Sequence, residues 1–418
     1  MIFLTITGSF TGAVFYDKYQ KKRIQQKWCD LVRPASEELL PPTHLPRKIT
    51  IYVSGPPGDS LRIAREHFYE YVKPVLVAGA LDWEVVEGRR EGDIRYGAAE
   101  RIRRRRRRAE GIRTDEDDEA GLKEELILDH RDRAGTIEWT GAGGDLIVGR
   151  NTWKEYVRGV HEGWLGPLQA PREAETPAAQ VSAETSRTET EKSNDGHAHS
   201  TLGDAAVEAA TNITQGQTAT GDSAAASDSS SATPTDDASP QAEKKPEEEK
   251  SKPKLLKPAP YISTSAYNTA STPSSMPQTL DPAVIVPFPH ILGFLNTPIR
   301  VARFLNRRQL ADDIGRQTAA LVMAEQHRSF RESMLTEDGD SVPEQELVLK
   351  EAEKEWPKSV RNRERKDGEE SVWLDNVVVD QRIGERMKLW ELRRIDEARA
   401  QELLEKGGRE QKAQDSDA

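Results

Sequence analysis

A run of arginines is the part of the sequence best suited to binding an anion. Apart from Ile102, every position from 101 to 108 is an arginine: Arg101, Arg103, Arg104, Arg105, Arg106, Arg107 and Arg108. Closely spaced guanidinium groups attract phosphates, either of a nucleic acid or of an anionic lipid such as cardiolipin. The same run could instead be a solvated helix face, balanced by the acidic residues from Asp115 onward. The lipid-binding and solvated-face interpretations stay equally open, and nuclear localisation is less favoured.

A glycine-containing loop at residues 55–60 is a second candidate site for an anion. Because the loop opens a predicted helix, its free backbone N–H groups could bind a phosphate. It has neither the GxxxxGK[ST] pattern, whose lysine reaches a terminal phosphate, nor the GxGxxG pattern. A nucleotide-binding enzyme is therefore a minor alternative.

The remaining signatures of catalysis and metal binding do not occur. The sequence contains no GxSxG, HExxH or CxxC motif. His197 and His199 are interpreted as solvated polar residues, because no set of metal ligands accompanies them. Cys29 is the single cysteine, which excludes an internal disulfide. We expect no catalytic residue, no cofactor and no metal, and therefore a protein that is not an enzyme.

The composition limits how much of the chain can form a packed core. Of the 418 residues, 35% are hydrophobic and 31% are charged, so much of the length must stay at the surface or unfolded. The net charge of -11 argues against a general nucleic-acid-binding protein, since a polyanion is bound by a surplus of lysine and arginine. A basic binding site would have to be local.

The first sixteen residues are uncharged and strongly apolar, which predicts a single transmembrane anchor at residues 1–16. As a helix this segment reaches about 24 Å, whereas the hydrocarbon core of a bilayer measures roughly 30 Å. We therefore expect the anchor to be truncated at its N-terminus. A secretory signal peptide would start with positive charge and end at a small-residue cleavage site, and neither is present.

Three small residues of the anchor share one helix face. Thr5, Gly8 and Gly12 are spaced by three and four, which favours close packing on a partner helix in lipid, although the spacing also arises by chance. A cluster of basic residues follows, between Lys18 and Lys27. By the positive-inside rule this cluster would stay on the side that is not translocated.

The pattern after the anchor predicts an α/β domain over residues 17–168. Alternation at residues 49–53 is typical of a half-buried strand, and a helix over 61–75 and a strand over 81–86 complete a βαβ-type unit. A short apolar strand is predicted at 146–148. It is followed by a helix whose Thr152 and Glu155 have the spacing of a capping box.

The second half of the chain changes character twice. Residues 169–260 have almost no large apolar side chains, which predicts a disordered low-complexity linker. Residues 261–408 are predicted to be mainly helical and charged, with a helix over 310–328, and residues 409–418 to form a disordered tail. Prolines interrupt the apolar residues 284–304, so a buried or interfacial segment is preferred there over a second transmembrane helix.

Long motifs in five stretches resemble the Tim54 family, a large accessory subunit of the carrier translocase of the mitochondrial inner membrane. The stretches are residues 2–30, ending in KKRIQQKWCD; 45–59, beginning with LPRK; 64–76, with AREHF and KPVL; 81–93, LDWEVVEGRREGD; and PHILGFLN at 289–296 with LADDIGR at 310–316. The resemblance covers most of the chain outside the predicted linker and the last stretch.

This resemblance implies a non-catalytic subunit of the Tim22 complex, which uses the membrane potential to insert multi-pass carrier proteins into the inner membrane. The N-terminus would lie in the matrix, and the bulk of the chain in the intermembrane space. The partners implied are the channel subunit, other inner-membrane subunits, the small Tim chaperones and, through them, carrier precursors. This orientation is the reverse of the one that the positive-inside rule predicts, and we follow the family.

The alternative from another class is a soluble nucleic-acid-associated protein that uses the arginine run. It predicts salt-sensitive binding that disappears when those arginines become glutamine. The sequence leaves open which surfaces meet other subunits, how many copies assemble, and whether the C-terminal helices pack on the α/β domain.

Overall fold

Five ranges of the chain are described by the computed structural model: residues 2–112, 119–170, 259–335, 339–365 and 370–417. The chain divides into two units, and all described residues belong to the first, formed by residues 1–171 and 255–418. The predicted disordered linker lies almost entirely outside the described residues. The acidic residues from Asp115 that were expected to balance the arginine run also lie outside them, as far as residue 118.

A six-stranded sheet organises the described unit, in the order β2-β1-β3-β4-β8-β5. Its strands are β1 (Lys48–Ser54), β2 (Asp82–Gly88), β3 (Asp145–Val148), β4 (Ala283–Val286), β5 (Gln326–Ser329) and β8 (Lys388–Glu391). All neighbouring strands run parallel except β5, which is antiparallel to β8 at the edge. The predicted α/β class and its three N-terminal strands are confirmed.

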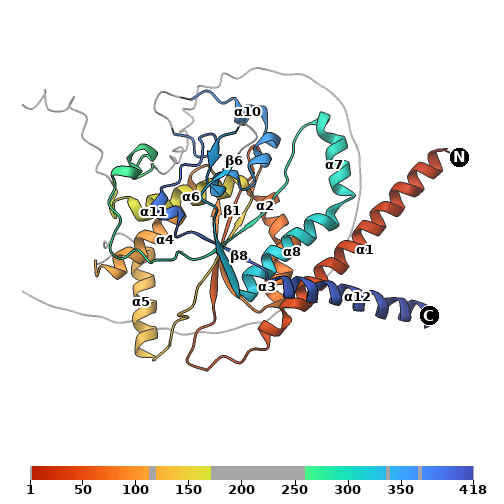
Figure 1. Cartoon of the computed structure of the whole chain (residues 1–418), viewed down its shortest axis with the longest axis horizontal. Helices are drawn as coiled ribbons and strands as arrows, with labels where there is room; N and C mark the ends of the chain where they lie inside the picture. The colour runs from red at the N-terminus through yellow and green to blue at the C-terminus, as the bar shows by residue number, and fades with distance from the viewer. Residues whose placement is uncertain (1, 113–118, 171–258, 336–338, 366–369, 418) are drawn as a thin grey trace, which may run out of the picture. The chain divides into compact units, whose positions relative to one another are not determined.

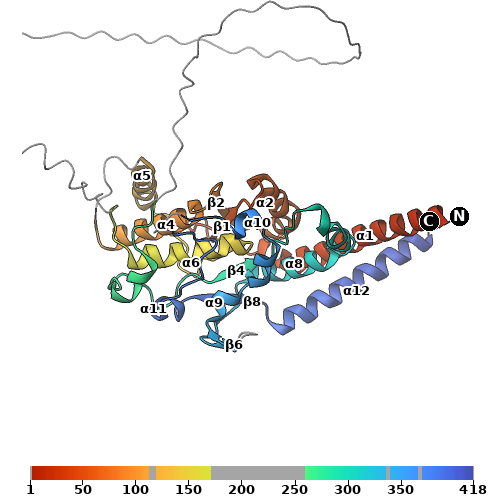
Figure 2. The ribbon, with the colours of Figure 1, turned by 90° about the horizontal axis from the view of Figure 1, so that it is seen from above.

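Helices cover both faces of this sheet (Figures 1 and 2). One face carries α1 (Ile2–Ser36), α2 (Leu61–His67), α3 (Lys73–Ala78), α8 (Arg307–Met323) and α12 (Arg394–Asp417). The other carries α4 (Asp93–Ala109) and α6 (Arg150–Leu165). The expectation of a half-buried first strand was therefore wrong: Ile51 and Val53 meet the first layer, and Tyr52 is equally buried against the second.

Shorter elements connect these layers. They are η1 (Phe68–Val72), α5 (Glu119–Arg133), η3 (Thr264–Thr269), η4 (Phe294–Asn296), α7 (Thr297–Phe304), β6 (Met334–Leu335), β7 (Ser341–Val342), α9 (Glu344–Leu347), η5 (Lys350–Glu355), α10 (Lys358–Arg361) and α11 (Gln381–Gly384). The helix predicted over 61–75 is in fact α2, a π-helical turn (η1) and α3. Pro74 lies in the first turn of α3, where its missing N–H costs nothing, and the wider turn accommodates it.

The region after residue 261 differs most from the prediction of mainly helical structure. It supplies three of the six strands, β4, β8 and β5, so it completes the same sheet that the N-terminal region begins. The helix predicted over 310–328 ends at Met323, because Ala324 adopts a left-handed conformation (φ 49°) and the chain then enters β5. At the other end, α12 continues to Asp417, through the residues predicted as a disordered tail. Residues with good helix propensity, Glu, Gln, Lys and Ala, fill that last stretch.

Candidate functional site

The first helix has two halves in different surroundings. Its second half is built into the core, where Trp28, Leu31 and Val32 are buried against the sheet-covering helices. Its first half carries exposed apolar side chains, among them Phe3 at 76% and Phe15 at 68% exposure. The change occurs at Asp17, which is buried. The predicted anchor is thus the free end of a helix whose other end is part of the fold.

No helix among residues 2–112, 119–170, 259–335, 339–365 and 370–417 is both long enough and apolar enough to cross a membrane.

Four polar contacts fix α1 to the start and middle of α8. The Asp17 carboxylate accepts hydrogen bonds from the backbone N–H groups of Arg307 (3.2 Å) and Arg308 (3.3 Å), and so it caps the N-terminus of α8. Farther along, the Trp28 indole N–H donates to Asp312 (2.9 Å), and Lys27 forms an ion pair with the same carboxylate (2.5 Å). These bonds hold the exposed half of α1 in a fixed direction.

Close packing reinforces the α1–α8 contact. A Cβ atom added at Gly315 would lie 2.1 Å from Cδ1 of the buried Trp28. Only glycine leaves room for the indole at this point of α8. The Trp28 ring of α1 therefore packs directly on the backbone of α8.

The C-terminal helix α12 packs on the other side of α1, which answers whether the C-terminal helices dock on the domain. Leu403 contacts the core, and the Arg23 guanidinium donates to the carbonyl of Leu404 (2.8 Å). Figures 1 and 2 show α12 following α1 away from the sheet. A groove of about 380 Å³ lies between them, lined by Tyr19, Lys22, Arg23 and Lys27 of α1 and by Leu403 of α12, among others.

The predicted helix-packing residues of the anchor lie in open surroundings. No atom approaches within 4 Å of a Cβ placed at Gly8 or Gly12, and Thr5 is exposed on the same half of α1. Packing of Thr5, Gly8 and Gly12 on a partner helix stays a prediction.

The arginine run forms the second half of α4, and most of its side chains are held by acids of the same unit. Arg103 is fully buried and pairs with Glu162 of α6, whose carboxylate also binds Arg95. Arg106 donates to the carbonyls of Gly163 and Gly166 (both 2.8 Å). The remaining arginines are paired as follows: Arg101 with Asp145, Arg104 and Arg107 with Glu100, and Arg105 with Asp281, while Arg108 is also engaged. Arg101, Arg103, Arg105 and Arg106 therefore bind α4 to its neighbours, whereas Glu100 belongs to α4 itself.

Two glycines of α6, which the sequence reasoning missed, allow α4 to come this close. A Cβ at Gly159 would lie 2.5 Å from the carbonyl oxygen of Arg95, and one at Gly163 would lie 2.7 Å from Cβ of Ile102. The spacing of four residues between these glycines was a readable signal, because it puts both on one face of the helix. The predicted capping box is absent because α6 begins at Arg150, which puts Thr152 inside the helix. Glu155 instead accepts from the N–H groups of Ile94 (2.9 Å) and Arg95 (3.3 Å) in α4.

A polar cavity of about 700 Å³ lies at the amino ends of the parallel strands, beside α4. Arg101, Arg104, Arg105 and Arg108 line it together with the buried carboxyl of Asp145. Burial raises the pKa of Asp145, and the neighbouring Arg101 guanidinium (2.8 Å) opposes that rise. The hydroxyl of Tyr156 donates to the same carboxyl (2.7 Å). This is the cavity into which part of the arginine run faces.

The opposite, carboxyl end of the sheet is where open α/β folds bind ligands, and here it is filled. The Asn151 side-chain amide donates to the hydroxyl of Ser54 (2.6 Å) and to the carbonyl of Gly55 (2.9 Å). These bonds join the first turn of α6 to the carboxyl end of β1. The cavity that remains measures about 10 Å³, closed by Phe288 and Trp356 among others. The first three residues of the loop at 55–60 are buried and the last three are exposed, and the cavity beside the loop is far too small for a nucleotide.

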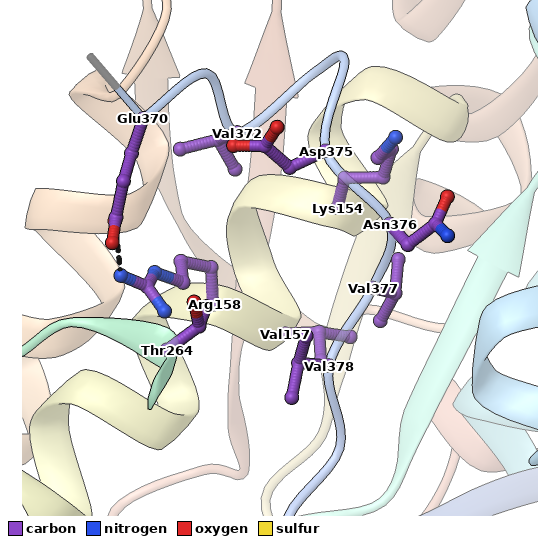
Figure 3. A pocket seen from close by; sticks show the side chains of 10 residues that line it. All are labelled: Lys154, Val157, Arg158, Thr264, Glu370, Val372, Asp375, Asn376, Val377 and Val378. Carbon is purple, nitrogen blue, oxygen red and sulfur yellow. Dashed lines mark hydrogen bonds and ion pairs between the residues drawn. The ribbon is translucent and has the colours of Figure 1, made fainter. Parts of the chain in front are cut away.

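A strap formed by residues 370–378 crosses α6 (Figure 3). Glu370 pairs with Arg158 (2.6 Å), and Lys154 donates to the carbonyl of Trp373. The cavity under the strap, about 30 Å³, holds little more than one water molecule. Three tryptophans of the C-terminal region pack within the described unit: Trp356 and Trp390 are buried, and the Trp373 indole N–H donates to Glu155 (2.6 Å).

Next to the strap, His161 is locked in its neutral form. It is fully buried, its Nδ1–H donates to the carbonyl of Val157 (2.8 Å), and its Nε2 accepts from the N–H of Asp380 (2.9 Å). Burial lowers the pKa of His161 to about 4, although its carbonyl partner and Asp380 oppose the shift. A proton on Nε2 would break the bond to Asp380.

This arrangement predicts a loss of stability in mild acid. Between pH 6.5 and about 4, the unfolded chain takes up a proton at His161 that the folded chain does not. The free energy of unfolding should fall there by roughly 1.4 kcal/mol per pH unit from this group. Urea denaturation of the full chain at several pH values measures the slope. His161→Gln should flatten it, whereas the exposed His130→Gln should not; equal slopes in both variants would contradict the prediction.

Comparison with known proteins agrees with the resemblance read from the sequence. Residues 1–390 match the family described as inner membrane protein import complex subunit Tim54. A mitochondrial import inner membrane translocase subunit tim54 of Aspergillus oryzae is 46% identical, over 97% of this chain and 86% of the relative. Proteins of the same name from Aspergillus fumigatus and Neurospora crassa are each 43% identical, over 97% and 96% of this chain and 89% and 79% of the relatives. The chain therefore belongs to the Tim54 family, whose members are named as subunits of the import translocase of the mitochondrial inner membrane.

Proposed function

We propose that this chain is a non-catalytic scaffold subunit of the translocase that inserts multi-pass carrier proteins into the mitochondrial inner membrane, driven by the membrane potential. The observation that carries the proposal is the division of α1 into an exposed apolar half and a half built into the core. With its apolar half in a membrane and its other half in the core, such a helix holds the folded body at a fixed position relative to the membrane. The filled crevice at the carboxyl end of the sheet supports a binding role rather than chemistry there.

In this proposal the first half of α1 is the single-pass anchor, with the N-terminus in the matrix and the body in the intermembrane space. By the positive-inside rule, the basic cluster after the anchor opposes that orientation. Two of its cations are already paired inside the folded body, however: Lys21 with Glu70 and Lys27 with Asp312. The rule counts lysine and arginine rather than net charge, so the proposed orientation rests on the family resemblance and not on these pairs.

The partners we propose are the channel subunit, other inner-membrane subunits and the small Tim chaperones, which bring carrier precursors. The face of Thr5, Gly8 and Gly12 suits a neighbouring helix in the membrane. Nucleic acid is not proposed as a partner. Arg103 and Arg106 are buried, and the acids that hold the other arginines reduce the field that a phosphate backbone would meet.

Extraction and protease accessibility test the proposal. After alkaline carbonate extraction of mitochondria the chain should stay in the membrane pellet, and after rupture of the outer membrane added protease should degrade its body. A variant with Phe3, Phe10 and Phe15 changed to glutamine should move to the supernatant, because three exposed apolar contacts with lipid are lost. Leu39→Gln, at an equally exposed site beyond α1, is the control. A wild-type chain in the supernatant, or a body protected from protease, would overturn the anchor and the orientation respectively.

A further inference from the structure

The segment between β4 and α8 carries a group of exposed large apolar side chains. They are Phe294 (88%), Leu295 (91%), Ile299, Val301 and Phe304, and no residue of η4 or α7 is buried. In Figure 1, α7 stands apart from the sheet. An exposed apolar set of this size on one short segment marks a contact with a membrane or a partner.

The orientation of α7 turns its apolar side outward. Arg303 forms an ion pair with Glu355 of η5, so this side of the helix faces the body. Successive residues of a helix are about 100° apart, which puts Val301 on the opposite side from Arg303. Pro298 and Phe304 lie on either side of Val301, each about 60° away around the helix. The face that α7 presents away from the body is therefore apolar.

The position of α7 joins this face to the free half of α1. Phe304 ends α7, and Arg307 begins α8, whose first N–H groups are capped by Asp17. The Arg308 guanidinium also lies 5.6 Å from the ring centroid of Tyr16. The end of α7 therefore lies close to the residues at which the apolar half of α1 leaves the body. If α1 inserts into a membrane there, α7 lies near the membrane surface.

Basic side chains surround the place where α7 ends and the apolar half of α1 begins. Lys18 and Lys22 of α1 and Arg300 and Arg307 around α7 are exposed. The nearby acids are engaged: Asp17 with Arg308, and Glu70 with Lys21 and Arg307. A helix with an apolar face and a rim of lysine and arginine fits the interface of a membrane that contains anionic phospholipid.

From these observations we infer that Phe294, Leu295 and α7 lie in the interfacial region of an anionic bilayer, beside the point where α1 enters it. The inference rests on the proposed anchoring of α1. It adds a second membrane contact, which fixes the tilt and rotation of the body relative to the bilayer as one helix alone would not.

Spin labels on the full-length chain test this contact. In a Cys29→Ser background, a nitroxide is attached at Leu295→Cys, Phe10→Cys or Leu39→Cys, and the chain is reconstituted into phosphatidylcholine vesicles with or without phosphatidylglycerol. Collisions with oxygen report lipid, and collisions with a water-soluble nickel chelate report water. Leu39 is the matched control, since it is 97% exposed but lies beyond the other end of α1.

The expected result is that the label at 295 resembles the one at 10: rich in oxygen collisions and protected from nickel, whereas the label at 39 is in water. Protection at 295 should weaken several-fold when phosphatidylglycerol is left out, and no change would overturn the anionic part of the inference. A label in lipid at 10 but in water at 295 would overturn the inference and leave the anchor standing. Protection at 295 that requires other translocase subunits would assign the face to a protein and overturn it too. Labels in water at both sites would remove the proposed anchoring itself.

Discussion

Replacing Glu162 with alanine is expected to lower the free energy of unfolding by about 3–5 kcal/mol, the cost of leaving buried charge unpaired. Arg95 and Arg103 both direct their guanidinium groups at this carboxylate, and all three side chains are buried. The backbone N–H of Tyr261 also donates to it (3.1 Å). The substitution removes a carboxylate that two buried cations share, and among the described residues Arg103 keeps only the less buried Glu100 (3.3 Å) as a carboxylate partner. Urea denaturation of the full chain in detergent, followed by far-UV circular dichroism, measures the loss.

A surface pair gives the matched control for this prediction. Arg62 and Glu66 form an ion pair between exposed side chains on α2, so Glu66→Ala should change the free energy of unfolding by no more than about 0.5 kcal/mol. A second variant, Glu162→Gln, keeps the shape but not the charge and should also destabilise strongly. If Glu162→Ala were as mild as Glu66→Ala, the α4–α6 contact would not depend on the buried ion pairs.

The sequence predicted the first half of the sheet well and the second half poorly, for a physical reason. The first strands have either alternation or a continuous apolar run, as at residues 49–53 and 146–148, and both patterns are local. The strand β8, with the sequence KLWE, has no such pattern. It is a strand because β4 and β5 lie on its two sides, a contact that brings together residues far apart in the chain. Periodicity does not report such contacts.

The candidate site shows the same limit at the level of side chains. A run of consecutive arginines points in every direction around α4, so the sequence did not reveal that Arg103 and Arg106 face α6 while Arg105 faces outward. Asp17 directly follows the predicted anchor, and no local pattern shows that it caps α8, nearly three hundred residues later. The apolar residues 284–304 belong to two different elements: the first three lie in β4 in the core, and the last eight form the exposed α7.

Trp28→Ala is the second substitution with a large expected effect, a loss of about 3–5 kcal/mol in the free energy of unfolding. The indole is buried, donates to Asp312, and fills the space that Gly315 leaves on α8. Its removal opens a cavity at the contact that fixes α1 to the body. Trp139→Ala, which removes a half-exposed tryptophan from a loop, is the control and should have a small effect.

A double-mutant cycle shows whether ring and glycine act as one contact. Alone, Gly315→Ala should destabilise by about 1–3 kcal/mol, because its Cβ overlaps the indole. In the Trp28→Ala background the overlap is gone, and the same change should become neutral or stabilising by up to about 1 kcal/mol, as alanine favours a helix over glycine. Additive effects would show that α1 and α8 do not meet at this point. Since the direction of the free half of α1 depends on that contact, additivity would also remove the physical basis for a body held at a fixed position above the membrane.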